Sequence, residues 1–342
     1  MRSFHTPTSS TTPASSAGLR PRLLLGTVVA LVAGAAGLLW LLSRQRPQLA
    51  VAITTWPGYE YFYLAEQEQL GRPYGLQLKV LQYSSLVDQR QAFERGDVPA
   101  LATTVPEAIA ICQEAPQRCP QLVLVLDESR GADRIVGRAD IRGPQQLRGR
   151  HVGLERSVLG VYMLVRSFGA RPPSLSQLRL QFDGPTALVK ALQAGNLDAI
   201  VTYAPHDTPL LNDPRFRVLF SSRSIPGEVV DVLAVDPAFA QRHPEDVKAL
   251  VQTWWAARSF ARRQSDQAIP VMAQRQQITP EEFRVTEKGL NYPGPAEQTL
   301  LLAPGGPLAR SITQMAALMQ ASGGIRGGAP LPQLSRAFLG TP

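Results

Sequence analysis

The sequence is poor in the residues that build metal centres. It contains two cysteines, Cys112 and Cys119, and four histidines in 342 residues. No C-x-x-C or H-E-x-x-H pattern occurs, and the histidines are scattered. This argues against a structural zinc site, and we expect neither a metal nor a cofactor. Outside the cytosol the two cysteines can pair as a disulfide; the alternative is two free thiols near the end of a helix.

The N-terminal 46 residues contain no acid, and this explains most of the basic charge. They hold five arginines, whereas the remainder has 30 Lys+Arg against 27 Asp+Glu. No basic stripe interleaved with aromatic residues occurs elsewhere, which argues against a nucleic-acid partner. Hydrophobic residues make up 44% of the chain and charged residues 18%, a composition that excludes a mainly disordered protein. The length allows two domains.

One long uncharged run is present. Residues 23–43 read LLLGTVVALVAGAAGLLWLLS, long enough to cross a membrane as a helix. We expect residues 22–43 to form an uncleaved transmembrane anchor, after a disordered tail over residues 1–21 rich in Ser, Thr and Pro. The alternative is a cleaved signal peptide. The only plausible cleavage site, at residues 50–52, would remove half of the next expected strand.

An internal repeat organises the rest of the chain. Residues 93–106 read FERGDVPALATTVP and residues 192–205 read LQAGNLDAIVTYAP. In both, Gly ends a helix, a short apolar strand follows, and Pro suits the first turn of the next helix. Strands predicted upstream of each copy make each half β-α-β-α-β, with a mainly parallel sheet. Two such α/β lobes imply a cleft between them, at the carboxyl ends of the strands.

The chain after the second half is expected to be largely helical. A strand over residues 228–235 leads into helices over residues 244–263, 281–288 and 308–321. We predict that residues 44–135 and 232–321 form lobe 1 and that residues 136–231 form lobe 2. Residues 322–342, rich in Gly and Pro, are predicted to be a flexible tail.

Six segments in order resemble the solute-binding proteins of ABC importers, in particular the nitrate/sulfonate/taurine and thiamine-precursor-binding family. They are TTWPGYEYFYLAEQEQLG (54–71), RGDVPALATTVPEAI (95–109), DESRGADRIVGR (127–138), QQLRGRHVGLE (145–155), ALQAGNLDAIVTYAP (191–205) and SSRSIPGEVVDVLAV (221–235). The resemblance implies a type II periplasmic-binding-protein fold, whose two lobes close over a small molecule and dock on a permease served by an ATPase. It further implies an extracytoplasmic position, anchored at the inner membrane or free in the periplasm if the segment is cleaved. We expect a monomer.

Residues at strand ends and helix starts are the candidates for ligand contact. Trp56 and Tyr59 follow the first strand, where backbone N–H groups and aromatic rings can receive a ligand. Thr103 and Thr104 follow the third strand, and Thr104 with Glu107 has the spacing of a capping box. For each of these residues, structural packing or capping is the alternative role.

The resemblance also brings residues of the crossovers and of lobe 2 to the cleft. The candidates are Ser129, Asp133, Glu155, Ser157, Tyr203 and Asp231. Ala204 stands where many relatives carry Glu, which changes the expected charge there. Proteins bind simple anions with Arg, Lys and bare N–H groups. The four candidate acids, Glu107, Asp133, Glu155 and Asp231, therefore favour a ligand with amine or heterocyclic donors. A sulfonate ligand is the alternative.

Three function classes remain. The first is the import of a solute of the sulfonate, nitrate or thiamine-precursor type. The second is a membrane-tethered ligand sensor of the same fold. The third is an enzyme resembling pyrimidine synthases, which carry a cysteine-rich stretch that this chain lacks, and no G-x-S-x-G nucleophile motif occurs. We therefore expect a binding protein and not an enzyme.

Overall fold

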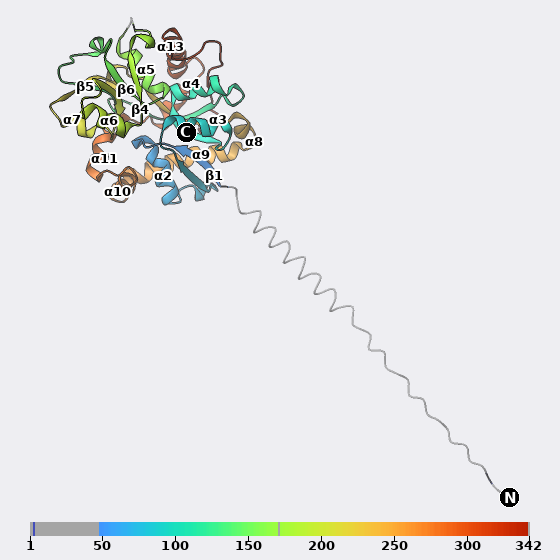
Figure 1. The fold of residues 1–342 in the computed structure, drawn as a ribbon. Coiled ribbons are helices and arrows are strands. Elements are labelled where there is room, and N and C mark those ends of the chain that lie inside the picture. Colours follow the sequence, from blue (N-terminus) through green and yellow to red (C-terminus); the bar gives the residue numbers. More distant parts are fainter. Residues whose placement is uncertain (1–2, 4–47, 170–171, 341–342) are drawn as a thin grey trace. The chain divides into compact units, whose positions relative to one another are not determined.

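A computed structural model describes residues 3, 48–169 and 172–340. The predicted tail and the predicted membrane segment over residues 22–43 lie outside the described residues. Among the helices that are described, none is long and apolar enough to span a membrane. Residues 48–340 carry two mixed sheets, and we call the part around each sheet a lobe (Figure 1).

Lobe 1 is built on a seven-stranded sheet in the order β11-β4-β10-β3-β1-β2, with β12 paired to β4. Its strands are β1 (Leu49–Ile53), β2 (Leu78–Gln82), β3 (Ala100–Thr104), β4 (Gln121–Ser129), β10 (Val230–Val235), β11 (Leu290–Asn291) and β12 (Gln333–Leu334). β1 runs parallel to β2 and β3, whereas β10 is antiparallel to β3 and β4.

Lobe 2 is built on a five-stranded sheet in the order β7-β6-β8-β5-β9. Its strands are β5 (Asp133–Arg138), β6 (His151–Leu154), β7 (Arg179–Phe182), β8 (Ala199–Tyr203) and β9 (Phe216–Ser221). β6 runs parallel to β7 and β8, as β1 does to β2 and β3. The predicted β-α-β-α-β repeat is therefore present in both lobes.

Helices cover both faces of each sheet. They are α2 (Glu60–Gln67), α3 (Leu86–Arg95), α4 (Val105–Glu114), α5 (Val158–Ser167), α6 (Pro185–Gln193), α7 (Thr208–Leu211), α8 (Pro237–Arg242), α9 (Pro244–Arg263), α10 (Ser265–Arg275), α11 (Pro280–Glu287), α12 (Pro295–Leu301) and α13 (Pro307–Ala321). In lobe 1, α2, α9 and α10 pack on one face and α3, α4 and α13 on the other. In lobe 2, α6 and α7 lie opposite α5.

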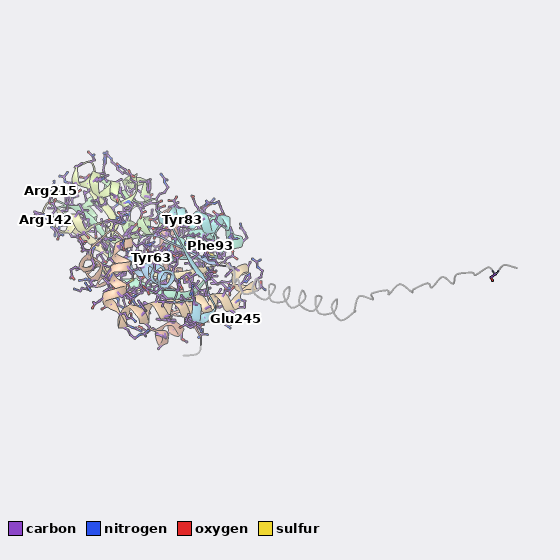
Figure 2. All side chains as sticks on the ribbon, turned by 90° about the horizontal axis from the view of Figure 1, so that it is seen from below. Tyr63, Tyr83, Phe93, Arg142, Arg215 and Glu245 are labelled. Carbon is purple, nitrogen blue, oxygen red and sulfur yellow. A yellow bond between two sulfur atoms is a disulfide. The ribbon has the colours of Figure 1, made fainter. Side chains whose placement is uncertain are left out.

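Successive side chains of a strand point to opposite faces of the sheet, and this explains how both faces of the lobe 1 sheet are buried. On β1, Val51 and Ile53 contact the α2 and α9 side, whereas Ala52 contacts the α3 and α4 side. Trp254 on α9 is 1% exposed and packs against Tyr61 and Phe62, the core role expected for this aromatic helix. At the outer surface of lobe 2, Arg142 and Arg215 project away from the core (Figure 2).

Two short segments connect the lobes. One runs from β4 to β5 through residues 130–132, and the other from β9 to β10 through residues 222–229. The predicted lobe boundaries, after residue 135 and after residue 231, lie a few residues from these connections, inside β5 and β10. The predicted division of the chain into lobes remains a proposal.

The C-terminal part differs from the expected loose tail. Gln333 and Leu334 pair with β4, and Phe338 is buried in lobe 1. A Gly- and Pro-rich composition disfavours helices, but it does not prevent a short extended segment from adding to an open sheet edge.

Candidate functional site

A cavity of about 290 Å³ lies where the two lobes face each other. Lobe 1 and its returning strand contribute Thr54, Thr55, Trp56, Tyr59, Leu86, Thr104 and Asp231; lobe 2 contributes Asp133, Leu159 and Tyr203. Thr54 follows β1 and Thr104 ends β3, two parallel strands that reach the cleft with their carboxyl ends. Ligands of open α/β sheets bind at such an edge.

A second cavity, of about 280 Å³, continues the first into lobe 2. The two share Leu86, Asp133, Leu159 and Tyr203. The second adds Glu155, Ser157, Gly160, Met163, Val201 and Thr202. The cleft is therefore one elongated site, walled by both lobes.

The candidate residues divide into those that line the two cavities and those that do not. The lining group is Trp56, Tyr59, Thr104, Asp133, Glu155, Ser157, Tyr203 and Asp231. Thr103, Glu107 and Ser129 are buried but lie outside both linings. The Thr103 hydroxyl has no hydrogen-bond partner among the described residues. A ligand contact for any of these residues remains a proposal.

Two aromatic rings meet across the cleft. The rings of Trp56 and Tyr203 lie 6.0 Å apart in an edge-to-face arrangement. Trp56 has an extended backbone, and Pro57 starts a single 3-10 turn from Pro57 to Tyr59 before α2 begins. We expected an α-helix to begin directly after Trp56, and the structure has this 3-10 turn instead. Trp56 and Tyr59, at the two ends of the turn, both line the cleft.

Two carboxyl groups lie side by side next to the cleft: Asp231 lines the larger cavity, and Asp127 lines neither cavity but is bonded to the lining residue Trp56. Asp127 on β4 and Asp231 on β10 are cross-strand partners. The Trp56 indole N–H donates to Asp127 Oδ1 at 3.2 Å, and the Tyr59 hydroxyl donates to Asp231. Burial raises the pKa of Asp127 to about 7. Burial and the adjacent Asp127 carboxylate raise the pKa of Asp231 well above its usual value.

Asp127 is a site residue that the sequence analysis passed over. It opens the polar stretch that follows the apolar residues 122–126 within β4, and that position was the available signal. Gly58 lies directly against it, because a Cβ at Gly58 would stand 1.9 Å from Asp127 Oδ2. The glycine therefore allows close approach to a carboxylate of the protein.

Two further carboxyl groups line the lobe 2 side of the cleft. Burial raises the pKa of Asp133 to about 6 and that of Glu155 to about 7. Burial and the neighbouring Glu155 raise the pKa of the Tyr203 phenol, which therefore stays neutral. Asp133 Oδ2 and Glu155 Oε1 accept no hydrogen bond from the described residues. Buried acceptors without donors are costly, so both oxygens are suited to a ligand that donates hydrogen bonds.

Neither cavity is lined by a lysine, arginine or histidine of the described residues. Arg134, next to Asp133 in the chain, is ion-paired with Asp207. His206 lies beside the cleft, half-buried, with its ring edge-on to that of Tyr203. Burial lowers the pKa of His206, so the ring is neutral at physiological pH. The lining is therefore acidic and aromatic.

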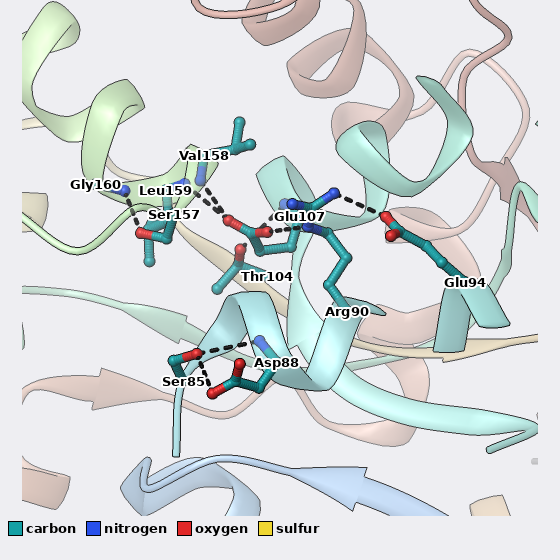
Figure 3. A network of polar contacts seen from close by, with 10 residues as sticks. All are labelled: Ser85, Asp88, Arg90, Glu94, Thr104, Glu107, Ser157, Val158, Leu159 and Gly160. Carbon is teal, nitrogen blue, oxygen red and sulfur yellow. Dashed lines mark hydrogen bonds and ion pairs between the residues drawn. The ribbon is translucent and has the colours of Figure 1, made fainter. Parts of the chain in front are cut away.

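Glu107 contacts the opposite lobe (Figure 3). Its Oε1 accepts hydrogen bonds from the backbone N–H groups of Val158 and Leu159, which begin α5, and its Oε2 lies 3.0 Å from Arg90 Nε. Burial raises the pKa of Glu107, and Arg90 partly offsets this.

The expected capping box at α4 is only half formed. Thr104 Oγ1 accepts a hydrogen bond from the Glu107 N–H at 3.4 Å, as a cap does. The Glu107 carboxylate does not return to Thr104, because it is bound to α5 and Arg90. At α5 itself, Ser157 caps the helix, with its Oγ accepting from the Gly160 N–H.

Ser129 belongs to the connection between the lobes. Its hydroxyl lies 2.8 Å from that of Ser222 on the other crossover and accepts from the Asp133 N–H. Ser222 Oγ also accepts from the Gly131 N–H at 2.7 Å. These bonds tie the two crossovers together.

Cys112 and Cys119 are joined by a disulfide, which closes a short loop between α4 and β4. Among residues 48–169 and 172–340, no group of three or more His, Cys, Asp and Glu is arranged to hold a metal ion.

Comparisons with known proteins support the sequence resemblance. A family model described as the NMT1-like family matches residues 176–275. A curated relative, the taurine-binding periplasmic protein of Escherichia coli (strain K12), is 25% identical over 232 residues, which cover 64% of this chain and 69% of the relative.

Solved structures share the fold. The alkanesulfonate-binding protein SsuA from Xanthomonas axonopodis pv. citri bound to MOPS matches with a TM-score of 0.68 and 15% identity, over 84% of this chain and 96% of that chain. The periplasmic nitrate-binding protein NrtA from Synechocystis PCC 6803 matches with a TM-score of 0.64 and 9% identity, over 83% of each chain. The chain thus has the two-lobed α/β fold of periplasmic binding proteins, and its similarity to the nitrate/sulfonate/taurine family of ABC solute-binding proteins is confirmed.

Proposed function

We propose that this chain is the extracytoplasmic solute-binding component of an ABC importer. It captures a small polar molecule between its lobes and delivers it to a permease. The observation that carries the proposal is the buried cleft, because both lobes wall it and only two short connections join them. The relatives described above, which are named for binding taurine, alkanesulfonate and nitrate, support the same role.

Binding works through closure of the lobes. The contacts between Trp56 and Tyr203 and between Glu107 and the start of α5 exist only when the lobes are together. A ligand held by residues of both lobes adds contacts to that closed state alone, so it shifts the open–closed equilibrium towards it. A permease that recognises the closed shape then receives loaded protein in preference to empty protein.

The proposal extends to the setting of the protein. The chain acts as a monomer anchored by residues 22–43 at the extracytoplasmic face of the inner membrane, and it performs no covalent chemistry. A tethered sensor would use the same cleft, so the two roles differ only in the partner that reads closure.

Closure is tested by small-angle X-ray scattering of the full-length chain, with titration calorimetry of the same samples. The probes are taurine, ethanesulfonate, nitrate, benzylamine and 4-aminopyrimidine. We expect at least one probe to bind stoichiometrically and to lower the radius of gyration. Binding without any change in radius would contradict the closure mechanism. Reconstitution with the permease and ATPase separates import from sensing, because only import requires that loaded protein stimulate ATP hydrolysis.

A further inference from the structure

We propose that the cleft binds a cation on a small ring, namely an amine, an amidine or a protonated amino-heterocycle. This rests on the proposed function and specifies the ligand of the same site. It departs from the sulfonate and nitrate after which several relatives are named.

The charge of the lining favours a cation. Three carboxyl groups, Asp133, Asp231 and Glu155, line the two cavities, and no lysine, arginine or histidine of the described residues joins them. Asp133, Asp231 and Glu155 are 3%, 1% and 7% exposed. None of these carboxyl groups offers a positive charge to an anion, and each one that is ionised would repel an anion at close range with little water to screen it.

The hydrogen-bonding capacity of the lining also favours a cation that donates hydrogen bonds. Asp133 Oδ2 and Glu155 Oε1 are buried and accept no hydrogen bond within the described part of the chain. An ionised carboxylate is acceptor-only, so these oxygens require N–H or O–H donors. A charged amine or amidine supplies several donors together with the opposite charge.

The backbone N–H donors at the start of α5 are already occupied. The start of α5 faces the cleft, and helix N-termini are common anion sites. Here Val158 N–H and Leu159 N–H donate to Glu107, and Gly160 N–H donates to Ser157 (Figure 3). A carboxylate of the protein itself thus occupies the place of an anionic ligand.

The aromatic residues indicate the rest of the ligand. Trp56, Tyr59 and Tyr203 line the larger cavity, and their rings attract cations and flat rings, which favours a cation carried on a ring.

A matched set of ligands tests this inference on the full-length chain. Benzylamine and benzamidine carry a cation on one ring; benzoate and benzenesulfonate carry an anion on the same ring; benzamide is the neutral analogue. Thermal unfolding and titration calorimetry are measured for each, with nitrate and taurine added. We expect a rise in Tm with the two cations and at least tenfold weaker binding of the anions.

Two isosteric variants locate the binding groups. Asp133→Asn and Glu155→Gln each remove one negative charge and keep the shape of the side chain. We expect each to weaken benzamidine binding at least tenfold while the Tm of the ligand-free protein stays the same or rises, because a buried unpaired charge is removed. Glu245→Gln is the matched control, since Glu245 is exposed at the start of α9 (Figure 2).

The outcomes separate the ligand class from the proposed function. Binding of benzenesulfonate or nitrate, with no binding of the cations, would overturn the ligand class and leave solute capture intact. Cation binding that survives both variants would overturn the assignment to these carboxylates. Absence of binding by every probe in both experiments would overturn the ligand class and the proposed function together.

Discussion

Glu107 of lobe 1 accepts hydrogen bonds from the backbone N–H groups at the start of a lobe 2 helix, with Val158 as its nearer partner. The carboxylate is fully buried and also lies against Arg90. A negative charge at a helix N-terminus is stabilised by the helix dipole and by the free N–H groups. Since the two partners belong to different lobes, this stabilisation is available only when the lobes are closed.

Replacing Glu107 by Gln is expected to shift the protein towards the open state. The amide keeps the shape but loses the charge that the helix terminus and Arg90 both stabilise. We expect a loss of about 1–2 kcal/mol from the closed state, from the strength of charged hydrogen bonds. Ligand affinity should fall roughly tenfold, and the radius of gyration of the ligand-free protein should rise in small-angle scattering.

Glu94→Gln is the matched control for that variant. Glu94 also binds Arg90, at 2.7 Å, but it contacts Arg90 on the far side from α5 (Figure 3). It should leave affinity and radius unchanged. Equal effects of the two variants would mean that Arg90, and not the contact with α5, is responsible.

Gly58→Ala is expected to damage the site through Asp127. The added methyl group would stand 1.9 Å from Asp127 Oδ2 and 2.7 Å from its Cγ, so the carboxylate must move. Overpacking of this kind costs about 1–3 kcal/mol of stability. We expect a lower Tm and at least tenfold weaker ligand binding in calorimetry.

Gly184→Ala provides the comparison, because a Cβ there meets nothing within 4 Å and its φ is −70°. It should change neither quantity. If Gly58→Ala binds as well as the unmodified protein, close approach to Asp127 is not required by the site.

The stability of the ligand-free protein should fall as the pH rises. Burial raises the pKa of Asp127 to about 7, of Asp133 to about 6 and of Glu155 to about 7. The native state therefore holds these protons more tightly than the unfolded state, and unfolding releases them. The stabilisation is complete below the unfolded values near pH 4 and is lost as the pH rises to about 7.

Thermal and denaturant unfolding between pH 4.5 and pH 8 measure this loss. Asp133→Asn should flatten the slope and, at pH 8, add on the order of 1–3 kcal/mol to the free energy of unfolding. A stability that increases with pH over this range would contradict the burial of these groups.

Ligand affinity should depend on pH in the opposite sense. Benzamidine stays charged from pH 5.5 to pH 8, whereas the lining carboxyl groups Asp133 and Glu155 lose protons over this range. Asp231 also lines the cleft, but its pKa is raised well above its usual value. The phenols Tyr59 and Tyr203 have raised pKa values and stay neutral. We expect affinity for benzamidine to rise about tenfold over this range in calorimetry; an affinity that falls would indicate binding to the protonated site.

Helices and their ends could be predicted from the sequence because they depend on the spacing of residues that are close together in the chain. Gly96 and Gly195 have φ values of 86° and 79°, the left-handed conformation expected where a helix ends. The predicted helix over residues 244–263 coincides with α9. The repeat of strand and helix predicted the parallel strands β1, β2 and β3 and their counterparts β6, β7 and β8. It did not predict that each sheet is mixed, because β10 and β5 join antiparallel from the crossovers.

Only part of the cleft could be predicted from the sequence. Trp56 was a candidate because it follows a strand, and Asp133, Glu155 and Asp231 were candidates through the family resemblance; all four line the cavities. The pairing of Asp127 with Asp231 was not accessible, because it depends on the register between β4 and β10.

The amino-acid sequence by itself determined local features such as the helix ends at Gly96 and Gly195 and the extent of α9, since caps, breakers and apolar periodicity act over a few residues. The tertiary structure alone decided which polar groups meet. It directed the Glu107 carboxylate to α5 instead of back to Thr104, and it joined residues 333–334 to β4. Both contacts join segments that are far apart in the chain. Their geometry depends on how the two lobes pack and on where a sheet edge is open, so no local sequence pattern predicts them.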